Sequence, residues 1–238
     1  MIIYGRNPVR EALRGRRGVE RVWATENARR SEDWLGGAPA VQAADAAEIE
    51  ERAGSPEHQG VCAQVGPYPY ARADGLLEDD DALVVVLDEV QDPHNLGAVC
   101  RVAEAVGAAG VVIPERRSAE VTAATAKASA GAVEHLPVAR VRNVADWLAA
   151  AKECDAWVYG AAAGPDSVPY GQPDYRGRVV VAMGSEGRGL RPRVAAACDQ
   201  LVALPQRGKV ESLNVSTAAA ALLYGILQFR ASPLDRGA

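Results

Sequence analysis

The chain has 238 residues, of which 48% are hydrophobic, so it can form one large domain or two modest ones with a sizeable core. No run of about 18 apolar residues occurs, which argues against a membrane span. Charge within the first six residues and the lack of an apolar stretch argue against a signal peptide, so we expect a cytoplasmic protein.

The net charge of −5 argues mildly against a nucleic-acid-binding surface over the whole molecule. The charge is unevenly distributed, however, because the first 30 residues hold eight Arg and three Glu, whereas residues 78–81 are four consecutive acids. A basic front on an acidic body fits an RNA contact confined to one region. A solvated helix face would give the same count, so both interpretations stay open.

The cysteines give no sign of a metal centre. Cys62, Cys100, Cys154 and Cys198 are widely spaced and form no CxxC pair, and the three histidines are scattered. We therefore expect free, buried thiols in a reducing compartment and no metal site.

The first part of the chain reads as a small α/β unit. Its predicted strands are 2–4, 19–24 and 61–65, and its predicted helices are 7–13 and 44–52. Gly and Pro then interrupt regular structure at 66–70, before the acidic run. We predict a domain over residues 1–66, a linker over 67–81 and a second domain over 82–238.

The second domain alternates between apolar strands and helical stretches. Strands are predicted at 82–88, 110–114, 134–138, 157–161, 178–183 and 200–204, and helices at 95–106, 119–130, 144–152, 191–197 and 213–229. This alternation predicts an α/β fold with a mostly parallel sheet and helices on both faces. The last helix is apolar on nearly every side, so we expect it to be buried or packed against a second subunit.

Ligands of such sheets bind beyond the carboxyl ends of the strands, where three loops stand out. The first loop, 88–101, contains Asn95 at the expected start of a helix and Arg101 within it. Capping alone would explain Asn95. It would not explain an Arg among apolar residues, which, if partly buried, needs an anionic or bidentate partner such as a phosphate.

The second loop, 183–190, has glycines at 184, 187 and 189, which permit positive φ and close approach of the backbone to a ligand. The spacing matches neither GxxxxGK[ST] nor GxGxxG, and Glu186 would repel a pyrophosphate. The loop therefore suits a cationic or neutral ligand, although a plain glycine-rich turn remains an alternative. The third loop, 204–217, gathers Ser212, Asn214, Ser216 and Thr217 at the start of the last helix, which is more than a cap requires.

In this order, the three loops resemble the signature motifs of the SpoU/TrmH branch of the SPOUT methyltransferases. The motifs are the Asn95–Arg101 spacing, GSEGRGL (184–190) and SLNVSTAAA (212–220). The segments YGRNPVREAL (4–13), HQGVCA (58–63) and AKASAGAVEHLPV (126–138) also resemble this family, so the likeness covers nearly the whole chain.

The resemblance implies a SPOUT α/β domain with a deep trefoil knot, preceded by a small domain like the ribosomal L30e fold that presents RNA. It implies a homodimer that methylates a ribose 2′-hydroxyl of RNA with S-adenosylmethionine, the nearest match being the 23S rRNA guanosine enzymes. The residues that would bind the cofactor are Ala161, Ala162, Ala163, Gly164, Met183, Gly184, Glu186, Gly187, Leu204, Ser212, Leu213 and Asn214.

The resemblance also implies a catalytic set, namely Asn95, Arg101, Glu186, Ser212 and Asn214. Arg101 would act as the base or, equally well, would bind the target phosphate while water takes the proton.

Three other functions are weighed against this one. They are the same chemistry on tRNA, an RNA-binding protein without catalysis, and a Rossmann oxidoreductase. The last lacks GxGxxG after its first apolar strand.

Overall fold

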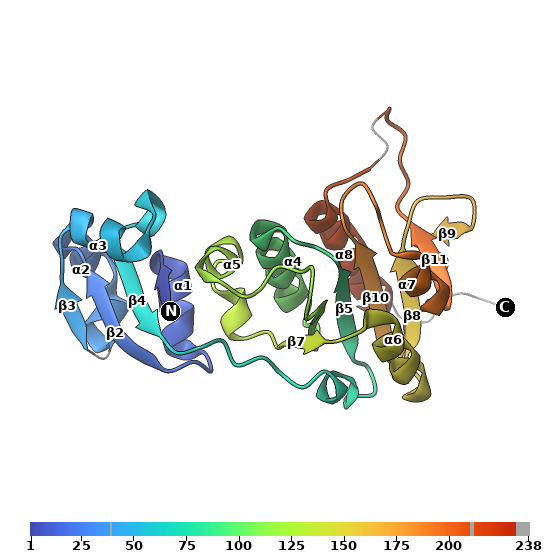
Figure 1. Ribbon diagram of the computed structural model, residues 1–238, viewed down its shortest axis with the longest axis horizontal. Coiled ribbons are helices and arrows are strands. Elements are labelled where there is room, and N and C mark those ends of the chain that lie inside the picture. Colours follow the sequence, from blue (N-terminus) through green and yellow to red (C-terminus); the bar gives the residue numbers. More distant parts are fainter. Residues whose placement is uncertain (39, 210–211, 232–238) are drawn as a thin grey trace. The chain divides into compact units, whose positions relative to one another are not determined.

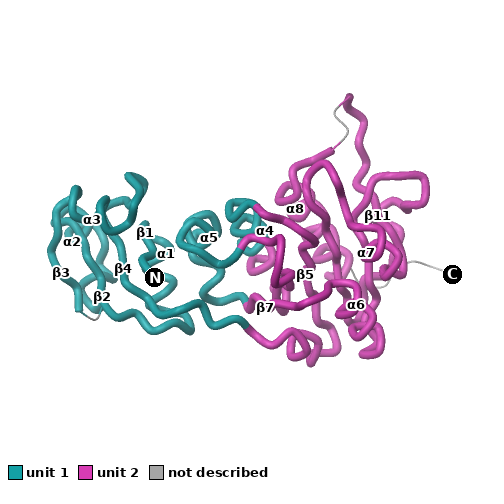
Figure 2. Tube along the Cα trace, viewed as in Figure 1, with its two compact units in different colours: residues 1–70, 92–101, 120–136 teal, residues 71–91, 102–119, 137–238 magenta. Residues whose placement is uncertain are grey.

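The computed structural model describes residues 1–238 apart from 39, 210–211 and 232–238. It divides into two compact units, which Figure 2 distinguishes by colour. Unit 1 comprises Met1–Tyr70, Asp92–Arg101 and Glu120–Leu136, and unit 2 comprises Ala71–Gln91, Val102–Ala119 and Pro137–Ala238. Because the units alternate along the chain, the division at residues 66 and 82 stays a prediction.

Unit 1 is built on a four-stranded sheet with the order β1-β4-β2-β3. Strand β4 is antiparallel to both β1 and β2, whereas β2 and β3 are parallel. The strands are β1 (Ile2–Tyr4), β2 (Val19–Ala24), β3 (Val41–Ala43) and β4 (Val61–Val65), and the helices from this part of the chain are α1 (Arg6–Arg14), α2 (Glu26–Ser31) and α3 (Ala46–Ala53), with 3₁₀ turns η1 (Asp33–Gly37) and η2 (Pro56–His58). A capping box between Asp45 and Glu48 starts α3, and Gly54 in the left-handed conformation ends it.

A later segment of the chain completes unit 1. Helix α5 (Ala123–Ala128) and the 3₁₀ turn η4 (Ala132–Glu134) pack against α1 and β1. Arg17 and Glu134 form an ion pair in this contact, and each side chain is only 1% exposed. Nearby, His135 Nε2 lies 2.9 Å from the carboxylate of Glu11.

Unit 2 is a seven-stranded sheet with the order β7-β6-β5-β10-β8-β11-β9, and every pairing is parallel. The strands are β5 (Leu83–Asp88), β6 (Gly110–Pro114), β7 (Val138–Val141), β8 (Trp157–Ala161), β9 (Ser167–Pro169), β10 (Val179–Gly184) and β11 (Gln200–Ala203). All six residues of β5 are buried, as expected for a strand covered on both faces. The predicted α/β class with a parallel sheet is confirmed.

Helices cover both faces of this sheet (Figure 1). On one face, α6 (Val144–Glu153) and α7 (Pro192–Ala197) join a single apolar cluster with alternate residues of β5, β8 and β10. On the other, α8 (Val215–Ala231) packs against β10, and its Phe229 meets the ring of Tyr175, which in turn meets Tyr159 of β8. Helix α4 (Pro93–Ala105) and the 3₁₀ turn η3 (Asp74–Leu77) complete the elements.

Some predicted elements were wrong. Residues 134–138 were expected to be a strand, but η4 ends at Glu134 and β7 begins only at Val138. Strands β3 and β9, of three residues each, and helix α2 were not predicted. The last helix begins at Val215 rather than at residue 213.

The four cysteines are free, but they are not all buried. Cys62 and Cys100 are buried, Cys198 is intermediate and Cys154 is exposed, which corrects the expectation of uniformly buried thiols. Within the described residues, no group of three or more His, Cys, Asp or Glu side chains could hold a metal ion, and no helix is long and apolar enough to cross a membrane.

Candidate active site

The loops that follow β8, β10 and β11 leave the same edge of the sheet of unit 2, because the carboxyl ends of neighbouring parallel strands lie together. Ala161 at the end of β8 is paired with Met183 of β10 on one side and with Val202 of β11 on the other. The last residues of these strands and the loops that follow them contain all the residues predicted to bind the cofactor. Those residues are therefore brought to one edge by the strand order β10-β8-β11.

The glycine-rich loop after β10 folds back on itself as a tight turn. Gly187 and Gly189 have φ angles of 76° and 66°, which confirms the predicted need for glycine at these two positions. The N–H group of Gly189 donates to the carbonyl of Ser185 over 2.9 Å. A Cβ atom on Gly184 would lie 2.0 Å from the carbonyl carbon of Gly189. The close approach at Gly184 is thus to the loop's own backbone, and the turn presents Glu186 to the exterior.

Asn214 connects this loop to the start of α8. Its side-chain oxygen accepts from the N–H of Ser216 at 2.9 Å and from the Ser216 hydroxyl at 2.5 Å, so Asn214 caps the helix. Its side-chain amide donates to the carboxylate of Glu186. One residue therefore both starts α8 and holds the glycine-rich loop. Ser212 and Leu213 precede the cap and are exposed.

The loop after β8 is tied down at its base. The N–H of Ala162 donates to the carbonyl of Val202 at 3.0 Å, which extends the sheet by one bond. The hydroxyl of Ser167 donates to the carbonyl of Ala162 at 2.8 Å. Ala163 and Gly164 lie beyond these bonds and are exposed. Ser167 was not predicted as a site residue, because β9 is too short to give a periodic signal in the sequence.

The loop at 88–101, which follows β5, differs from the prediction in two ways. Asp92, not Asn95, caps α4: its carboxylate accepts from the N–H of His94 at 2.9 Å and its carbonyl from the N–H of Leu96 at 3.1 Å. Asn95 lies in the first turn and is half-buried. Arg101 is exposed rather than partly buried, and its guanidinium makes no hydrogen bond or ion pair within the described residues of unit 1. It is therefore available to bind an anion.

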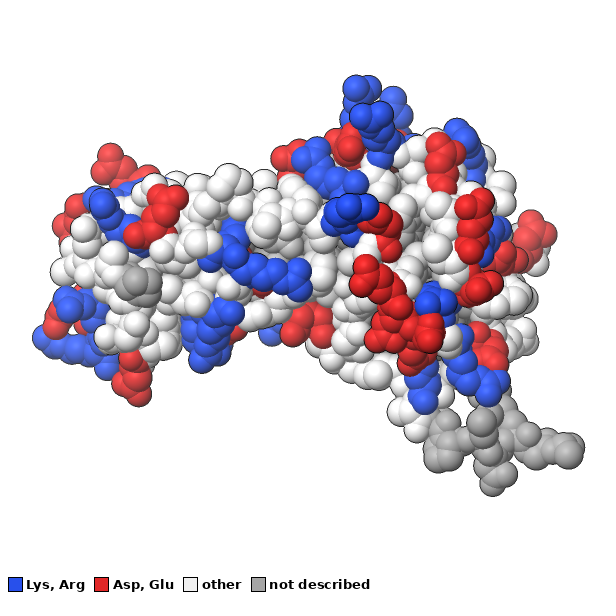
Figure 3. All heavy atoms as spheres, turned by 90° about the horizontal axis from the view of Figure 1, so that it is seen from below, with Lys and Arg blue, Asp and Glu red and all other residues white. Residues whose placement is uncertain are grey.

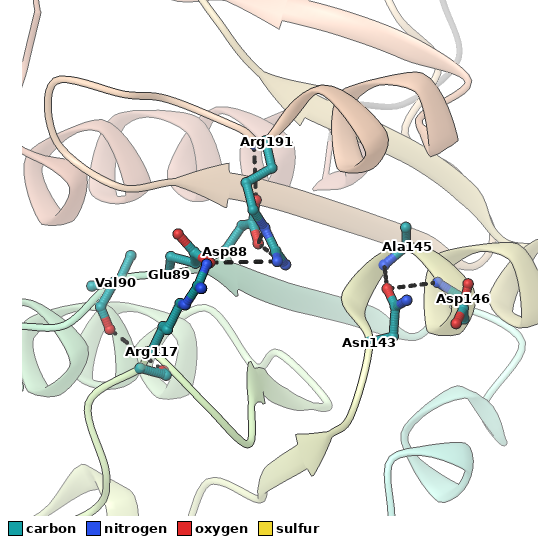
Figure 4. A network of polar contacts seen from close by, with 9 residues as sticks. Asp88, Glu89, Val90, Arg117, Asn143, Ala145, Asp146 and Arg191 are labelled. Atoms are coloured by element: carbon teal, nitrogen blue, oxygen red, sulfur yellow. Dashed lines mark hydrogen bonds and ion pairs between the residues drawn. The ribbon is translucent and has the colours of Figure 1, made fainter.

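A buried carboxylate at the end of β5 holds the glycine-rich loop from its other side (Figure 4). Asp88, whose side chain is completely buried, accepts from Nε of Arg191 at 2.8 Å and from its backbone N–H at 2.9 Å. Hydrogen bonding to Asp88 raises the pKa of Arg191. Glu89, in the left-handed conformation with φ of 58°, lies 3.4 Å from both Arg191 and Arg117. This network of Asp88, Glu89, Arg117 and Arg191 was not predicted from the sequence.

The basic front of the chain is largely neutralised in unit 1. Six of its eight Arg residues form ion pairs with Glu residues, namely Arg6, Arg10, Arg14, Arg17, Arg29 and Arg30. Figure 3 shows basic, acidic and uncharged side chains interspersed on the face in view. The alternative interpretation of the arginine count, as paired and solvated helix faces, accounts for most of these residues.

Comparison with known proteins identifies the family. Residues 82–224 match the SpoU rRNA Methylase family, and residues 2–71 match the domain described as RNA 2′-O ribose methyltransferase substrate binding. The chain belongs to the SpoU methylase family. The resemblance given by the three loops is confirmed.

Relatives and solved structures agree with this assignment. The chain is 38% identical to a Bacillus subtilis protein named as a TrmH family tRNA/rRNA methyltransferase, YacO, over 96% of this chain and 95% of that protein. It is also 38% identical to an uncharacterized tRNA/rRNA methyltransferase of Synechocystis, of whose length it spans 64%. The crystal structure of the SpoU methyltransferase AviRb from Streptomyces viridochromogenes with AdoMet has a TM-score of 0.80 and 25% identity, covering 98% of this chain and 91% of AviRb.

Proposed function

We propose that this SpoU family member methylates the 2′-hydroxyl of a ribose in RNA with S-adenosylmethionine, in the cytoplasm, and that its target is a guanosine of 23S rRNA. The observation that carries the proposal is the sheet edge where three loops meet and Asn214 bonds to Glu186. The matched substrate-binding domain and the structure of AviRb with AdoMet support it. The relatives are named for both tRNA and rRNA, so a tRNA ribose is the alternative target.

The residues at this edge fit the proposed cofactor. S-adenosylmethionine carries a positive sulfonium, and Glu186 offers an exposed carboxylate on a loop that does not have the pattern of a phosphate site. Exposed main-chain groups at Ala163 and Gly164 can hydrogen-bond to the rest of the molecule. When bound, the cofactor supplies a methyl group on a sulfur that leaves as a neutral thioether, so no acid is needed.

In the proposed reaction the 2′-oxygen forms a bond to the methyl carbon as the carbon–sulfur bond breaks, and the hydroxyl proton passes to water. Arg101 binds the phosphate of the target nucleotide and orients the hydroxyl, because a guanidinium stays protonated in proteins and is a poor base. Asn95 and Ser212 hold the nucleotide or Arg101. Glu186 and Asn214 hold the cofactor loops. Positioning of the 2′-hydroxyl beside the methyl group supplies much of the rate acceleration.

The test is transfer of labelled methyl groups to 23S rRNA and to tRNA, followed by digestion to nucleosides. Label in 2′-O-methylguanosine from 23S rRNA supports the proposal. Label only in tRNA overturns the proposed target, and RNA binding without transfer overturns catalysis. Arg101→Ala should abolish transfer while calorimetry shows unchanged affinity for S-adenosylmethionine. An equal loss of cofactor binding would contradict the role of Arg101.

We also propose that the exposed face of α8 forms a homodimer contact. Tyr224 and Leu227 are 51% and 37% exposed there, and with Tyr170 they line a groove of about 530 Å³. Burial of such apolar side chains is what an obligate subunit contact provides. Sedimentation should show a dimer that Leu227→Asp dissociates and that Ala47→Asp, which adds the same charge on the exposed part of α3, leaves intact.

The domain division at residues 66 and 82 and the trefoil knot in the second domain belong to the same proposal. The insertion of β10 between β5 and β8, which precede it in the chain, is compatible with such a knot.

A further inference from the structure

The charged side chains of unit 2 differ between the two edges of its sheet. The amino edge is acidic, because residues 78–81 precede β5 and Asp155, Asp174 and Asp199 precede β8, β10 and β11. Four cations near this edge pair with acids, namely Lys152, Arg176, Arg178 and Arg230. The positive charges at the amino edge are therefore neutralised within the protein.

The carboxyl edge has cations without such partners. Five Lys and Arg side chains of unit 2 make no hydrogen bond or ion pair with any residue that the structure describes, and all five follow the carboxyl end of a strand. They are Arg116 after β6, Arg142 after β7, Arg188 after β10, and Arg207 and Lys209 after β11. In a chain with a net charge of −5, their restriction to one edge points to an anionic partner there.

Arg116 and Arg142 follow neighbouring strands. Pro114, the last residue of β6, is paired with Val141, the last residue of β7. Arg142 comes directly after this pair and Arg116 two residues after it, so the two arginines start from adjacent points of the edge, and both are exposed. With Arg117, whose side chain is 74% exposed, they form what we call the arginine strip.

The loop that carries Arg116 and Arg117 is fixed to the loop after β5. The N–H of Ala119 donates to the carbonyl of Val90 at 2.9 Å, and the hydroxyl of Ser118 donates to the same carbonyl at 3.4 Å. Arg117 has a φ angle of 58°, which is uncommon for a residue with a side chain. Such a conformation persists where the surrounding structure enforces it, and it is concentrated at functional sites.

The composition of the strip selects an anion. Residues 115–118 and 142–143 contain three arginines and one acid, Glu115. A guanidinium offers donors and no acceptor, and phosphate oxygens match its geometry.

The extent of the positive edge selects a polyanion. Three strand spacings separate β7 from β10, whose loop carries Arg188, and at about 4.8 Å each they amount to about 14 Å. A free phosphate cannot extend over that distance, whereas the backbone of a nucleic acid can. The same edge continues into the loops that contain the predicted cofactor residues.

We propose that the arginine strip binds the phosphate backbone of the RNA substrate on one side of the nucleotide to be methylated, and that it guides the strand along the carboxyl edge from β7 to the glycine-rich loop. The inference rests on the proposed function, because it assigns a further surface to the RNA that the enzyme would methylate. This surface lies in unit 2, outside the matched substrate-binding domain. Phosphate contacts fix the position of a strand without reading its sequence, so the strip contributes affinity and register.

The test measures binding of a labelled 23S rRNA transcript to the full-length protein by filter binding, between about 50 and 200 mM salt. Each phosphate contact that is lost should lower the slope of log K against log salt by about 0.7–0.9. Arg116→Gln combined with Arg142→Gln should therefore lower the slope by about 1.4–1.8 and weaken binding severalfold. In methyl transfer the same variant should raise KM for RNA and leave kcat and the affinity for S-adenosylmethionine unchanged, because these contacts are equal in the ground state and the transition state.

Arg72→Gln combined with Arg176→Gln is the matched control. It also removes two positive charges from exposed side chains of unit 2, which are 87% and 57% accessible, but neither follows the carboxyl end of a strand. Its slope and KM should equal those of the wild type. Arg116→Lys combined with Arg142→Lys keeps both charges and should restore the slope.

Four other results would overturn the proposal. If the strip variant and the control lower the slope equally, or if neither does, the strip is no specific contact, and methylation by the wild type leaves the proposed function intact. If the strip variant weakens binding of heparin and not of 23S rRNA, the strip serves another polyanion. If kcat falls while KM stays unchanged, the two arginines act in the reaction and not in docking. If the wild type neither binds nor methylates RNA, the proposed function fails as well.

Discussion

The buried ion pair between Arg17 and Glu134 should contribute strongly to the stability of unit 1. Glu134→Gln preserves the shape of the side chain and removes its charge. Arg17 donates from Nε and Nη2 to the two carboxylate oxygens, and its Nη1 is buried with no hydrogen bond among the described residues. Besides the carboxylate of Glu134, the guanidinium of Arg17 contacts the ring of Tyr68, whose centroid lies 5.5 Å from Arg17 Cζ.

The expected loss follows from that geometry. A glutamine keeps one acceptor but turns an N–H group toward the guanidinium, so one charged hydrogen bond is lost and a buried charge is left uncompensated. Breaking such a pair costs about 3 kcal/mol or more. For a protein of this size that corresponds to a melting temperature lower by about 6–12 °C. Replacing both partners, Arg17→Met with Glu134→Leu, should cost less than the single change.

Urea and thermal unfolding would measure the loss, and hydrogen exchange would localise it to α1 and η4. Asp74→Asn is the control, since its ion pair with Arg72 is exposed, with side chains 87% and 67% accessible. That change should leave stability unaltered within error. If Glu134→Gln unfolds like Asp74→Asn, the pair contributes nothing and the argument from burial is wrong.

Two further predictions concern the cofactor loops of unit 2, and a third concerns the four thiols. Asn214→Asp keeps the cap of α8 but places a carboxylate against that of Glu186. We therefore expect unchanged stability of the helix and at least a severalfold weaker affinity for S-adenosylmethionine, measured by calorimetry. Unchanged affinity would contradict the link between the two loops. Gly184→Ala puts a Cβ 2.0 Å from Gly189, so cofactor binding should be lost in a protein whose far-ultraviolet circular dichroism is retained; normal binding would show that the turn can relax. Cys154 is the exposed thiol and should be the first to react with Ellman's reagent at pH 8, whereas burial raises the pKa of the other thiols to about 11 or 12, so their thiolates are scarce until far higher pH; simultaneous labelling of all four would refute this.

The longer strands of unit 2 were predictable because a strand buried on both faces is a continuous run of apolar residues. The residues of β5 are apolar up to Asp88, and β6 and β8 begin and end where the pattern placed them. Strands β3 and β9 lack such a run, since three partly exposed residues are too few to show a hydrophobic pattern. The false strand at 134–138 failed for another reason. Glu134 is buried by its pairing with Arg17, a contact over 117 residues of chain.

The candidate site shows the same limit, since motif spacing identified its loops but not the bonds that hold them. Asp88 and Arg191 are 103 residues apart, and they meet because β5 and β10 are neighbours with Asp88 opposite Gly184. Strand order is not encoded in any local pattern, so a carboxylate at a strand end could equally be a ligand of the substrate. Once the order is known, each polar residue at a strand end can be tested against the loop of the adjacent strand. By that test Asp88 has a partner within the protein and is not needed to bind a substrate. Arg101 lies within α4 and not at a strand end, and its exposed guanidinium, which pairs with nothing described in unit 1, remains available for the phosphate that we propose it binds.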